Sequence, residues 1–230
     1  MDNIAEIAMD SIEDALTALA RGEMVVVLDD KNRENEGDLI IAAEHATPEA
    51  LAFIVRHTTG IVCVALEGAR ADALGLDPMV RANDDRHGTA FTVTVDARRG
   101  TTTGVSAADR SATIVALIDP ETRPDDLMRP GHMFPLRARP GGVIERPGHT
   151  EAAVDLARLA GCVPAGVLCE IVRDDGAMAR TPEIIRFARA HRLCIVTIAD
   201  LIVYLREGRD RRPSVHSISH ASGLEAGAMR

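Results

Sequence analysis

Short apolar runs alternate with longer amphipathic stretches along the chain. Six runs, each six to eight residues long, are rich in Val, Ile, Leu and Ala. Apolar runs of this length with many β-branched residues are typical of β-strands. We therefore predict strands at residues 24–29, 38–44, 61–66, 90–97, 166–172 and 193–198.

Helix-start signals precede several of the amphipathic stretches. Ser11 and Ser106 are each followed three residues later by an aspartate, which is the pattern of a capping box. Thr47 and Thr181 are each followed by Pro and Glu, which suit the first turn of a helix. We predict helices at residues 12–21, 47–57, 69–76, 106–118, 151–160, 181–191 and 199–207.

Two regions lack a regular pattern of apolar residues. Residues 119–149 are rich in Pro, Gly, Arg and His, so we predict a long loop there. Residues 208–230 lose their periodicity and are predicted to form a flexible tail. The remaining pattern predicts a single domain over residues 1–207. Its fold class is α+β, a layered α/β sandwich in which helices cover a mixed β-sheet.

Composition and charge narrow the class of protein. Hydrophobic residues make up 46% of the chain and aromatic residues 2%, so the core must be aliphatic. A net charge of −9 argues against nucleic-acid binding, and no apolar run reaches the roughly 20 residues that span a bilayer. The acidic N-terminus does not resemble a signal peptide, and the four cysteines are dispersed. We expect a cytoplasmic protein with reduced thiols.

An acidic segment separates the first two predicted strands. Its carboxylates are Asp29, Asp30, Glu34, Glu36 and Asp38. Clustered carboxylates repel one another, and a bound divalent cation would relieve that repulsion. Hard oxygen ligands suit Mg²⁺ or Mn²⁺. The alternative is a solvated charged turn. The glycine just before the last of these carboxylates is expected to allow a sharp turn.

The tetrapeptide Arg-Pro-Gly-His occurs twice, at residues 129–132 and 146–149. Each copy places a permanent cation beside an imidazole, which can hold a phosphate and either ligate a metal or move a proton. The second copy precedes a predicted helix, whose N-terminus favours an anion. Coincidence within Pro/Gly-rich sequence is the alternative.

Two further features are weaker signals. The Thr/Gly loop at residues 101–106 precedes a helix and could cradle a phosphate, although an ordinary capping loop explains it as well. Glu170 is a lone acid within an apolar strand. It either faces solvent or, in a closed site, acts as a general acid or base. Together these features suit metal-assisted chemistry on a small phosphorylated substrate, without choosing among isomerase, aldolase, phosphatase and lyase.

Several segments resemble 3,4-dihydroxy-2-butanone 4-phosphate synthases, over roughly residues 12–207. They include DDKNRENEGDLIIAAE, FTVTVDARRGTTTGVSAADRSATI and RPGHMFPLRARPGGVIERPGHTEAAVDLARLAG. The resemblance implies a Mg²⁺-dependent lyase of riboflavin biosynthesis, with two ions and with Mn²⁺ as an alternative. Such an enzyme converts ribulose 5-phosphate to L-3,4-dihydroxy-2-butanone 4-phosphate and formate, and it is expected to be a homodimer.

The resemblance also implies roles for individual residues. The expected metal ligands are Glu34 and His149. Catalytic roles are expected for His132, Glu170, Asp30 and Cys63. The expected substrate-binding residues are Arg33, Glu34, Asp38, Thr103, Arg146, Pro147, Gly148, His149, Thr150 and Glu170. Thr59 departs from the family pattern and is expected to lie away from the catalytic groups.

Some relatives carry a GTP cyclohydrolase II domain after the synthase. This chain extends about two dozen residues past the resemblance and lacks clustered cysteines, so a monofunctional enzyme is expected. Two alternatives remain open. One is a different Mg²⁺-dependent lyase or isomerase of pentose phosphates, and the other is a non-catalytic sugar-phosphate-binding module. Formate release distinguishes the expected enzyme from both.

Overall fold

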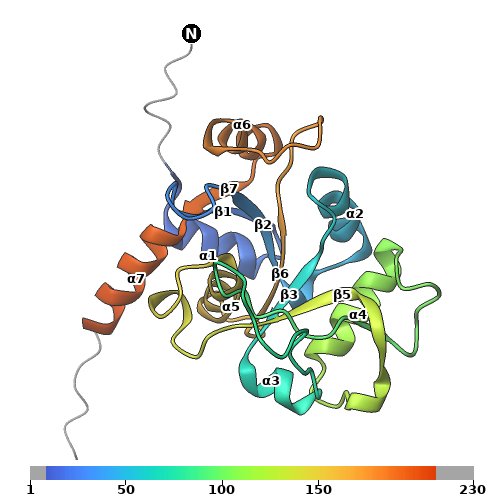
Figure 1. The fold of residues 1–230 in the computed structure, drawn as a ribbon. Coiled ribbons are helices and arrows are strands. Elements are labelled where there is room, and N and C mark those ends of the chain that lie inside the picture. Colours follow the sequence, from blue (N-terminus) through green and yellow to red (C-terminus); the bar gives the residue numbers. More distant parts are fainter. Residues whose placement is uncertain (1–8, 211–230) are drawn as a thin grey trace, which may run out of the picture.

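The computed structural model describes residues 9–210, which form three layers with a β-sheet in the middle (Figure 1). The sheet has seven strands in the order β4-β5-β3-β6-β2-β1-β7. The strands are β1 Val25–Leu28, β2 Gly37–Ala42, β3 Cys63–Leu66, β4 Val95–Ala97, β5 Leu127–Arg137, β6 Ala165–Glu170 and β7 Cys194–Thr197. Parallel and antiparallel pairs both occur, so the predicted mixed sheet and α+β class are confirmed.

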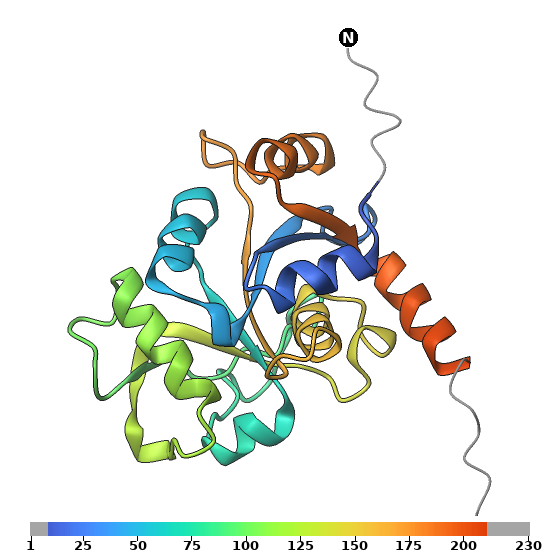
Figure 2. The same ribbon diagram turned by 180° about the vertical axis from the view of Figure 1, so that it is seen from behind.

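Helices cover both faces of the sheet, as the two opposite views show (Figures 1 and 2). One face packs against α1 Ile12–Ala20, α5 His149–Leu159 and α7 Ile198–Asp210. The other packs against α2 Pro48–His57, α3 Gly68–Ala73, α4 Ala107–Ile118 and α6 Thr181–His191. Each face buries its own aliphatic cluster, which gives the sheet the two apolar surfaces that a sandwich requires.

The predicted helix starts are confirmed where capping residues marked them. The backbone N–H of Asp14 donates to the Ser11 hydroxyl at 3.1 Å, and that of Asp109 donates to Ser106 at 3.0 Å. Each bond satisfies an N–H group that the first helical turn leaves unpaired. Local chemistry therefore determines these boundaries.

The prediction of a loop over residues 119–149 is wrong, because β5 crosses this region. Pro130 and Pro135 lower the strand propensity of the segment, since proline lacks an N–H group. The strand nevertheless forms because β3 and β4 pair with it on either side. Tertiary pairing thus overrides a weak local preference. The predicted strand at 90–97 is shortened in turn, and only its last residues form β4.

Gly131, in the first Arg-Pro-Gly-His copy, is required by the close approach of β5 to β4. A Cβ atom placed on Gly131 would lie 2.0 Å from the carbonyl carbon of Val95. The atom in conflict belongs to the backbone and cannot rotate away. Gly131 is therefore required for strand packing, which the repeated tetrapeptide did not indicate.

The expected tail at residues 208–230 is described only in its first residues, where α7 continues to Asp210. The rest of the tail lies outside the described residues, and the domain limits stay a prediction. Within residues 9–210, none of the helices combines the length and the apolar character needed to span a membrane.

We expect Gly131→Ala to lower the free energy of unfolding by about 3 kcal/mol, because the added methyl group forces two strands apart. Gly208→Ala is a matched control, since nothing lies within 4 Å of the position of its Cβ and alanine favours a helix. Urea denaturation of both variants measures the difference. Equal stability of the two variants would contradict the proposed backbone conflict.

Candidate active site

A cavity of about 220 Å³ lies where β2, β3 and β6 meet the N-terminus of α5. Its lining is mostly polar, although three apolar side chains contribute. The predicted site residues among its lining are Arg33, Glu34, Asp38, Cys63, Arg146, His149, Thr150 and Glu170. The other lining residues are Glu36, Asp85, Thr89, Phe91, Leu136 and Leu168. The structure therefore brings most of the predicted residues together.

Asp29 organises the acidic segment from within. Its carboxylate accepts hydrogen bonds from the backbone N–H groups of Glu34 and Glu36, at 3.0 and 2.9 Å. It also accepts from the Arg33 guanidinium at 3.0 Å, and its side chain is fully buried. One carboxylate of the group is thus used to fold the segment and to hold the others in place.

The expected turn at Gly37 is wrong, because the chain turns two residues earlier. Asn35 adopts a positive φ of 55°, a conformation that Asn tolerates. Gly37 already belongs to β2, where an added Cβ atom would lie 2.9 Å from side-chain atoms of Leu28 and Ile184. The glycine therefore permits close packing.

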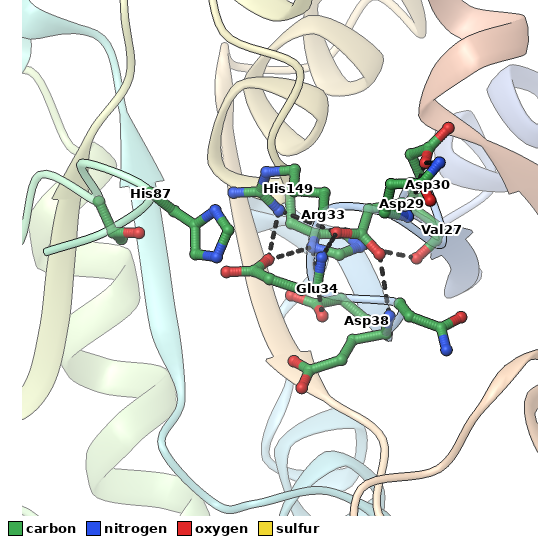
Figure 3. Close-up of polar contacts among 12 residues, drawn as sticks. Val27, Asp29, Asp30, Arg33, Glu34, Asp38, His87 and His149 are labelled. Carbon is green, nitrogen blue, oxygen red and sulfur yellow. Dashed lines mark hydrogen bonds and ion pairs between the residues drawn. The ribbon is translucent and has the colours of Figure 1, made fainter.

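His149 is buried and held in one orientation. Its Nε2–H donates to the backbone carbonyl of Val27 at 3.0 Å, which leaves the Nδ1 lone pair directed at the carboxylates (Figure 3). Nδ1 lies 3.6 Å from Asp38 and 3.9 Å from Glu34. Burial lowers the pKa of His149, so the ring is neutral near pH 7 and these contacts are not salt bridges.

Asp38 is a buried carboxylate with an unsatisfied oxygen. Among the described residues, its Oδ1 has no hydrogen-bond partner. Burial raises the pKa of Asp38 well above its usual range, and the negative charges of Glu170 and Glu34 add to the effect. An unpaired buried acceptor is costly and therefore indicates a missing ligand.

The residues fit a divalent cation. Ligand atoms of Asp29, Glu34 and His149 all lie within 4.8 Å of one another. Ligands about 2.1 Å from a Mg²⁺ ion stand roughly 3–4 Å apart, so the separations around Nδ1 match. Ligating histidines usually donate their second ring N–H to a carbonyl, as His149 does. Glu34 and His149 are the ligands that the sequence predicted, and Asp29, whose oxygens already accept hydrogen bonds within the segment, lies beside them.

The N-terminus of α5 is open toward the cavity. No side chain caps it, whereas the N-terminus of α4 is capped by Ser106. The loop before α4 is also filled by a carboxylate, because Asp109 accepts from the N–H groups of Thr102 and Gly104 at 3.0 and 3.1 Å. The loop at 101–106 is therefore a capping loop, and of these two helix starts it is α5 whose first amides no side chain caps.

Arg146 lines the cavity but already has protein partners. Its guanidinium pairs with buried Glu151 at 2.6 Å and donates to the Thr89 hydroxyl and the His87 carbonyl. A Cβ atom on Gly148 would lie 2.3 Å from this guanidinium. The glycine of the second tetrapeptide therefore makes room for the arginine, which holds residues 87–89 against the site.

Glu170 projects into the cavity from the end of β6, opposite Asp38 in the sheet. The hydroxyl of Thr59 donates to its carboxylate at 2.6 Å. The expectation that Thr59 lies away from the catalytic groups is therefore wrong. Nearby Cys63 is buried, and burial raises the pKa of its thiol well above the usual value. The thiol is thus protonated near pH 7.

His132 and Thr103 do not line this cavity. His132 lies on β5, where its Nδ1 is 2.7 Å from Asp96, and half of its side chain is exposed. A Cβ atom on Gly104, the residue after Thr103, would lie 2.7 Å from Nδ1 of His132. These residues therefore form a second cluster.

Two other predicted residues lie beside the cavity. Asp30 and Pro147 line an adjoining hollow that shares Arg33 with it. The exposed carboxylate of Asp30 accepts from the backbone N–H of Asn32 at 2.7 Å, which is an Asx turn. The geometry gives Asp30 a part in shaping the segment, and its catalytic role stays a prediction.

Sequence reasoning missed several residues around the site. Asp85, Thr89 and Phe91 enter the cavity from a stretch without a chemical motif. Asp96 was assigned only to a strand, yet it orients His132. The only sequence signal for this role of Asp96 was its place as a carboxylate near the end of an alternating strand.

Fold and cavity together define the class of protein. It is an α/β sandwich whose cavity carries carboxylates and a histidine, the donor groups that metal-assisted enzymes use. The sequence model of the 3,4-dihydroxy-2-butanone 4-phosphate synthases matches residues 13–204, and the chain belongs to this family.

Curated relatives and solved structures agree with this assignment. The chain is 56% identical over 224 residues to a riboflavin biosynthesis protein RibBA of Salinispora arenicola, covering 94% of this chain and 53% of the relative. It is 59% identical over 201 residues to RibBA of Mycobacterium tuberculosis, covering 86% of this chain and 47% of the relative. The chain therefore spans about half the length of these relatives, and the expected monofunctional organisation stays a prediction.

A crystal structure of a 3,4-dihydroxy-2-butanone 4-phosphate synthase in complex with two magnesium ions is 47% identical, with a TM-score of 0.85. The match covers 89% of this chain and all of that one. The synthase of Candida albicans is 50% identical with a TM-score of 0.80. The match covers 86% of this chain and 98% of that one. Both matches extend over nearly all of the solved chain, so the similarity includes the whole sheet and its helices.

We expect Mg²⁺ to bind in the cavity with an affinity that rises with pH. The pKa of Asp38 is raised, and a cation held beside it at Glu34 and His149 favours its ionised form, so binding releases protons. Glu34→Gln and His149→Ala should each weaken binding by roughly tenfold or more. Calorimetric titration in two buffers of different ionisation enthalpy measures affinity and proton release.

Glu23→Gln is the matched control for the loss of one carboxylate, because Glu23 is exposed and pairs only with Arg21 among the described residues. It should leave Mg²⁺ affinity unchanged. Wild-type affinity in both Glu34→Gln and His149→Ala would place the cation elsewhere.

Proposed function

We propose that the chain converts D-ribulose 5-phosphate to L-3,4-dihydroxy-2-butanone 4-phosphate and formate, a step in riboflavin biosynthesis. The observation that carries the proposal is the position of a neutral, oriented His149 next to the unsatisfied carboxylate of Asp38. Family membership narrows the substrate, and the cavity supplies the groups that such a substrate requires.

The proposed cofactor is Mg²⁺, as two ions, with Mn²⁺ as an alternative hard cation. Glu34 and His149 would hold it, with Asp29 beside them. When bound, the cation would polarise adjacent oxygens of the substrate and stabilise negative charge on them. The solved relative with two magnesium ions supports this assignment.

The chain's own residues bind the substrate and move its protons. The free amides of α5, at Thr150, would receive the phosphate, and Arg146 adds a positive charge nearby. Arg33, Asp38 and Gly148 would bind the sugar oxygens.

Proton transfer at the substrate carbons requires a base on the cavity wall. Glu170 is suitably placed, because Thr59 fixes its carboxylate while it still faces the cavity. The protonated thiol of Cys63 lies beside it and excludes water. These groups would serve the successive enolisation, dehydration and formate-releasing steps.

We also propose that the active form is a homodimer in which His132 and Thr103 of one protomer complete the cavity of its partner. His132 is oriented by Asp96 through Nδ1, which makes Nε2 the nitrogen available to a substrate. Its ring is half exposed and lies outside the cavity of its own chain. A histidine–carboxylate dyad that lies outside the cavity of its own chain fits a shared site.

The four free cysteines, none of which forms a disulfide, are consistent with the expected cytoplasmic location. We therefore propose that the protein acts in the cytoplasm. This location agrees with a biosynthetic reaction on a small phosphorylated sugar.

The purified chain should release formate from ribulose 5-phosphate with Mg²⁺ and none after chelation by EDTA. Formate quantification, together with identification of the four-carbon product by mass spectrometry, tests this. Glu170→Gln should lower kcat by a factor of about 100 or more, as expected for loss of a general base. An isomerised sugar or free phosphate without formate would replace the proposal with another activity.

A mixing experiment tests the shared site. His132→Ala and His149→Ala should each be inactive, whereas an equimolar mixture refolded or exchanged together should recover about a quarter of wild-type activity. Half of randomly formed dimers are mixed, and each has one intact site of its two. A mixture that stays inactive although mixed dimers are detected would place all groups of the site in one chain.

A further inference from the structure

A second group of metal-ligating side chains lies at the other end of β2 from the cavity. Asp38 is near the start of this strand, and the 3-10 turn η2 (Ala43–His45) follows its last residue. Glu44 and His45 of this turn lie beside Cys162, which follows α5. Their carboxylate oxygen, imidazole nitrogen and thiol sulfur all lie within 4.8 Å of one another.

Glu44 presents one oxygen to this group. Its Oε2 accepts a hydrogen bond from the backbone N–H of Val163 at 2.6 Å, which anchors the carboxylate. The other oxygen, Oε1, lies 3.7 Å from Nε2 of His45. That distance is too long for a hydrogen bond, so the two side chains do not satisfy each other.

His45 and Cys162 are positioned by the end of α1. The His45 ring lies over Gly22, where a Cβ atom would be 3.2 Å from Cγ and 3.3 Å from Nδ1. Nδ1 therefore lies on the Gly22 side, while Nε2 faces Glu44. The sulfur of Cys162 is 4.0 Å from the carbonyl of Leu19, a weak contact at most. The three donor atoms thus come from two segments, η2 and the residues after α5, and the end of α1 lies against both.

The donor set differs in kind from that of the cavity. Thiolate, imidazole and a single carboxylate suit Zn²⁺, whereas the acidic segment offers mainly hard oxygens. Only about one third of the His45 and Glu44 side chains is exposed, so they can move while remaining held by their neighbours. Donors around a tetrahedral Zn²⁺ stand roughly 3.5 Å apart, so about 1 Å of closure is required.

We propose that Glu44, His45 and Cys162 form a Zn²⁺ site with water as the fourth ligand. The ion would connect η2 at the end of β2 to the segment after α5. The opposite ends of these two elements carry Asp38 and His149. The site is therefore a structural clip on the two elements that build the cavity, and it does not depend on the proposed reaction.

Cobalt is the probe, because a tetrahedral Co²⁺–thiolate site absorbs in the visible and near ultraviolet. The chain is stripped with a chelator and titrated with Co²⁺ in the presence of excess Mg²⁺, which occupies the cavity. We expect one equivalent to produce the thiolate charge-transfer band, Zn²⁺ to displace it, and Zn²⁺ to raise Tm by binding only the folded state. Cys162→Ser and His45→Ala should abolish the band and weaken Co²⁺ binding by roughly tenfold or more.

Two variants control for the other thiols and the other metal site. Cys194→Ser removes a half-buried cysteine elsewhere, and His149→Ala removes the proposed ligand in the cavity. Both should keep the charge-transfer band. No band in the wild type, a band that survives Cys162→Ser, or a band lost in His149→Ala would overturn the proposal.

Discussion

The buried carboxylate of Asp38 sets the constraint that the rest of the site must meet. It faces Glu34, Glu36 and Glu170, and one of its oxygens has no partner among the described residues. A carboxylate in this position can stay protonated or can be paired with a cation, and both states serve metal-assisted proton chemistry. The aliphatic sandwich is what makes the constraint severe, because it keeps water away from the strand that carries Asp38.

Hydrogen bonds to the backbone and close packing fix the positions of these mutually repelling carboxylates and of His149. Asp29 uses its own carboxylate to fix the backbone of the acidic segment, and the Val27 carbonyl fixes the His149 ring. The helix that carries His149 packs through Ala153 against Gly166 of β6, where only a glycine leaves room. β6 in turn pairs with β2, the strand that carries Asp38. Preorganised ligands of this kind lose little entropy when a cation binds.

The predicted site residues fall into two clusters, and the division follows the order of the sheet. β2, β6 and β3 carry the cavity residues, whereas β5 and β4 carry His132 and Asp96. Opposite ends of β2 and α5 also differ in chemistry, with hard oxygens at one end and a thiol, an imidazole and a carboxylate at the other. The same two elements thus carry two groups of donor atoms that suit different metals.

The sequence by itself determined the features that depend on neighbours in the chain. Capping pairs such as Ser11 with Asp14 set helix starts, and apolar runs marked most strands, because both signals act within a few residues. The sequence also indicated an acidic metal-binding segment, although it did not separate Asp29, which folds the segment, from Glu34, which faces the cavity.

Only the tertiary structure decided what depends on distant contacts. It made a strand of the proline-containing β5, because β3 and β4 pair with it, and it moved His132 away from the cavity. It also brought Cys162 to Glu44, more than a hundred residues earlier in the chain. No local pattern encodes such proximity, since it arises only when the sheet and the helices that cover it are assembled.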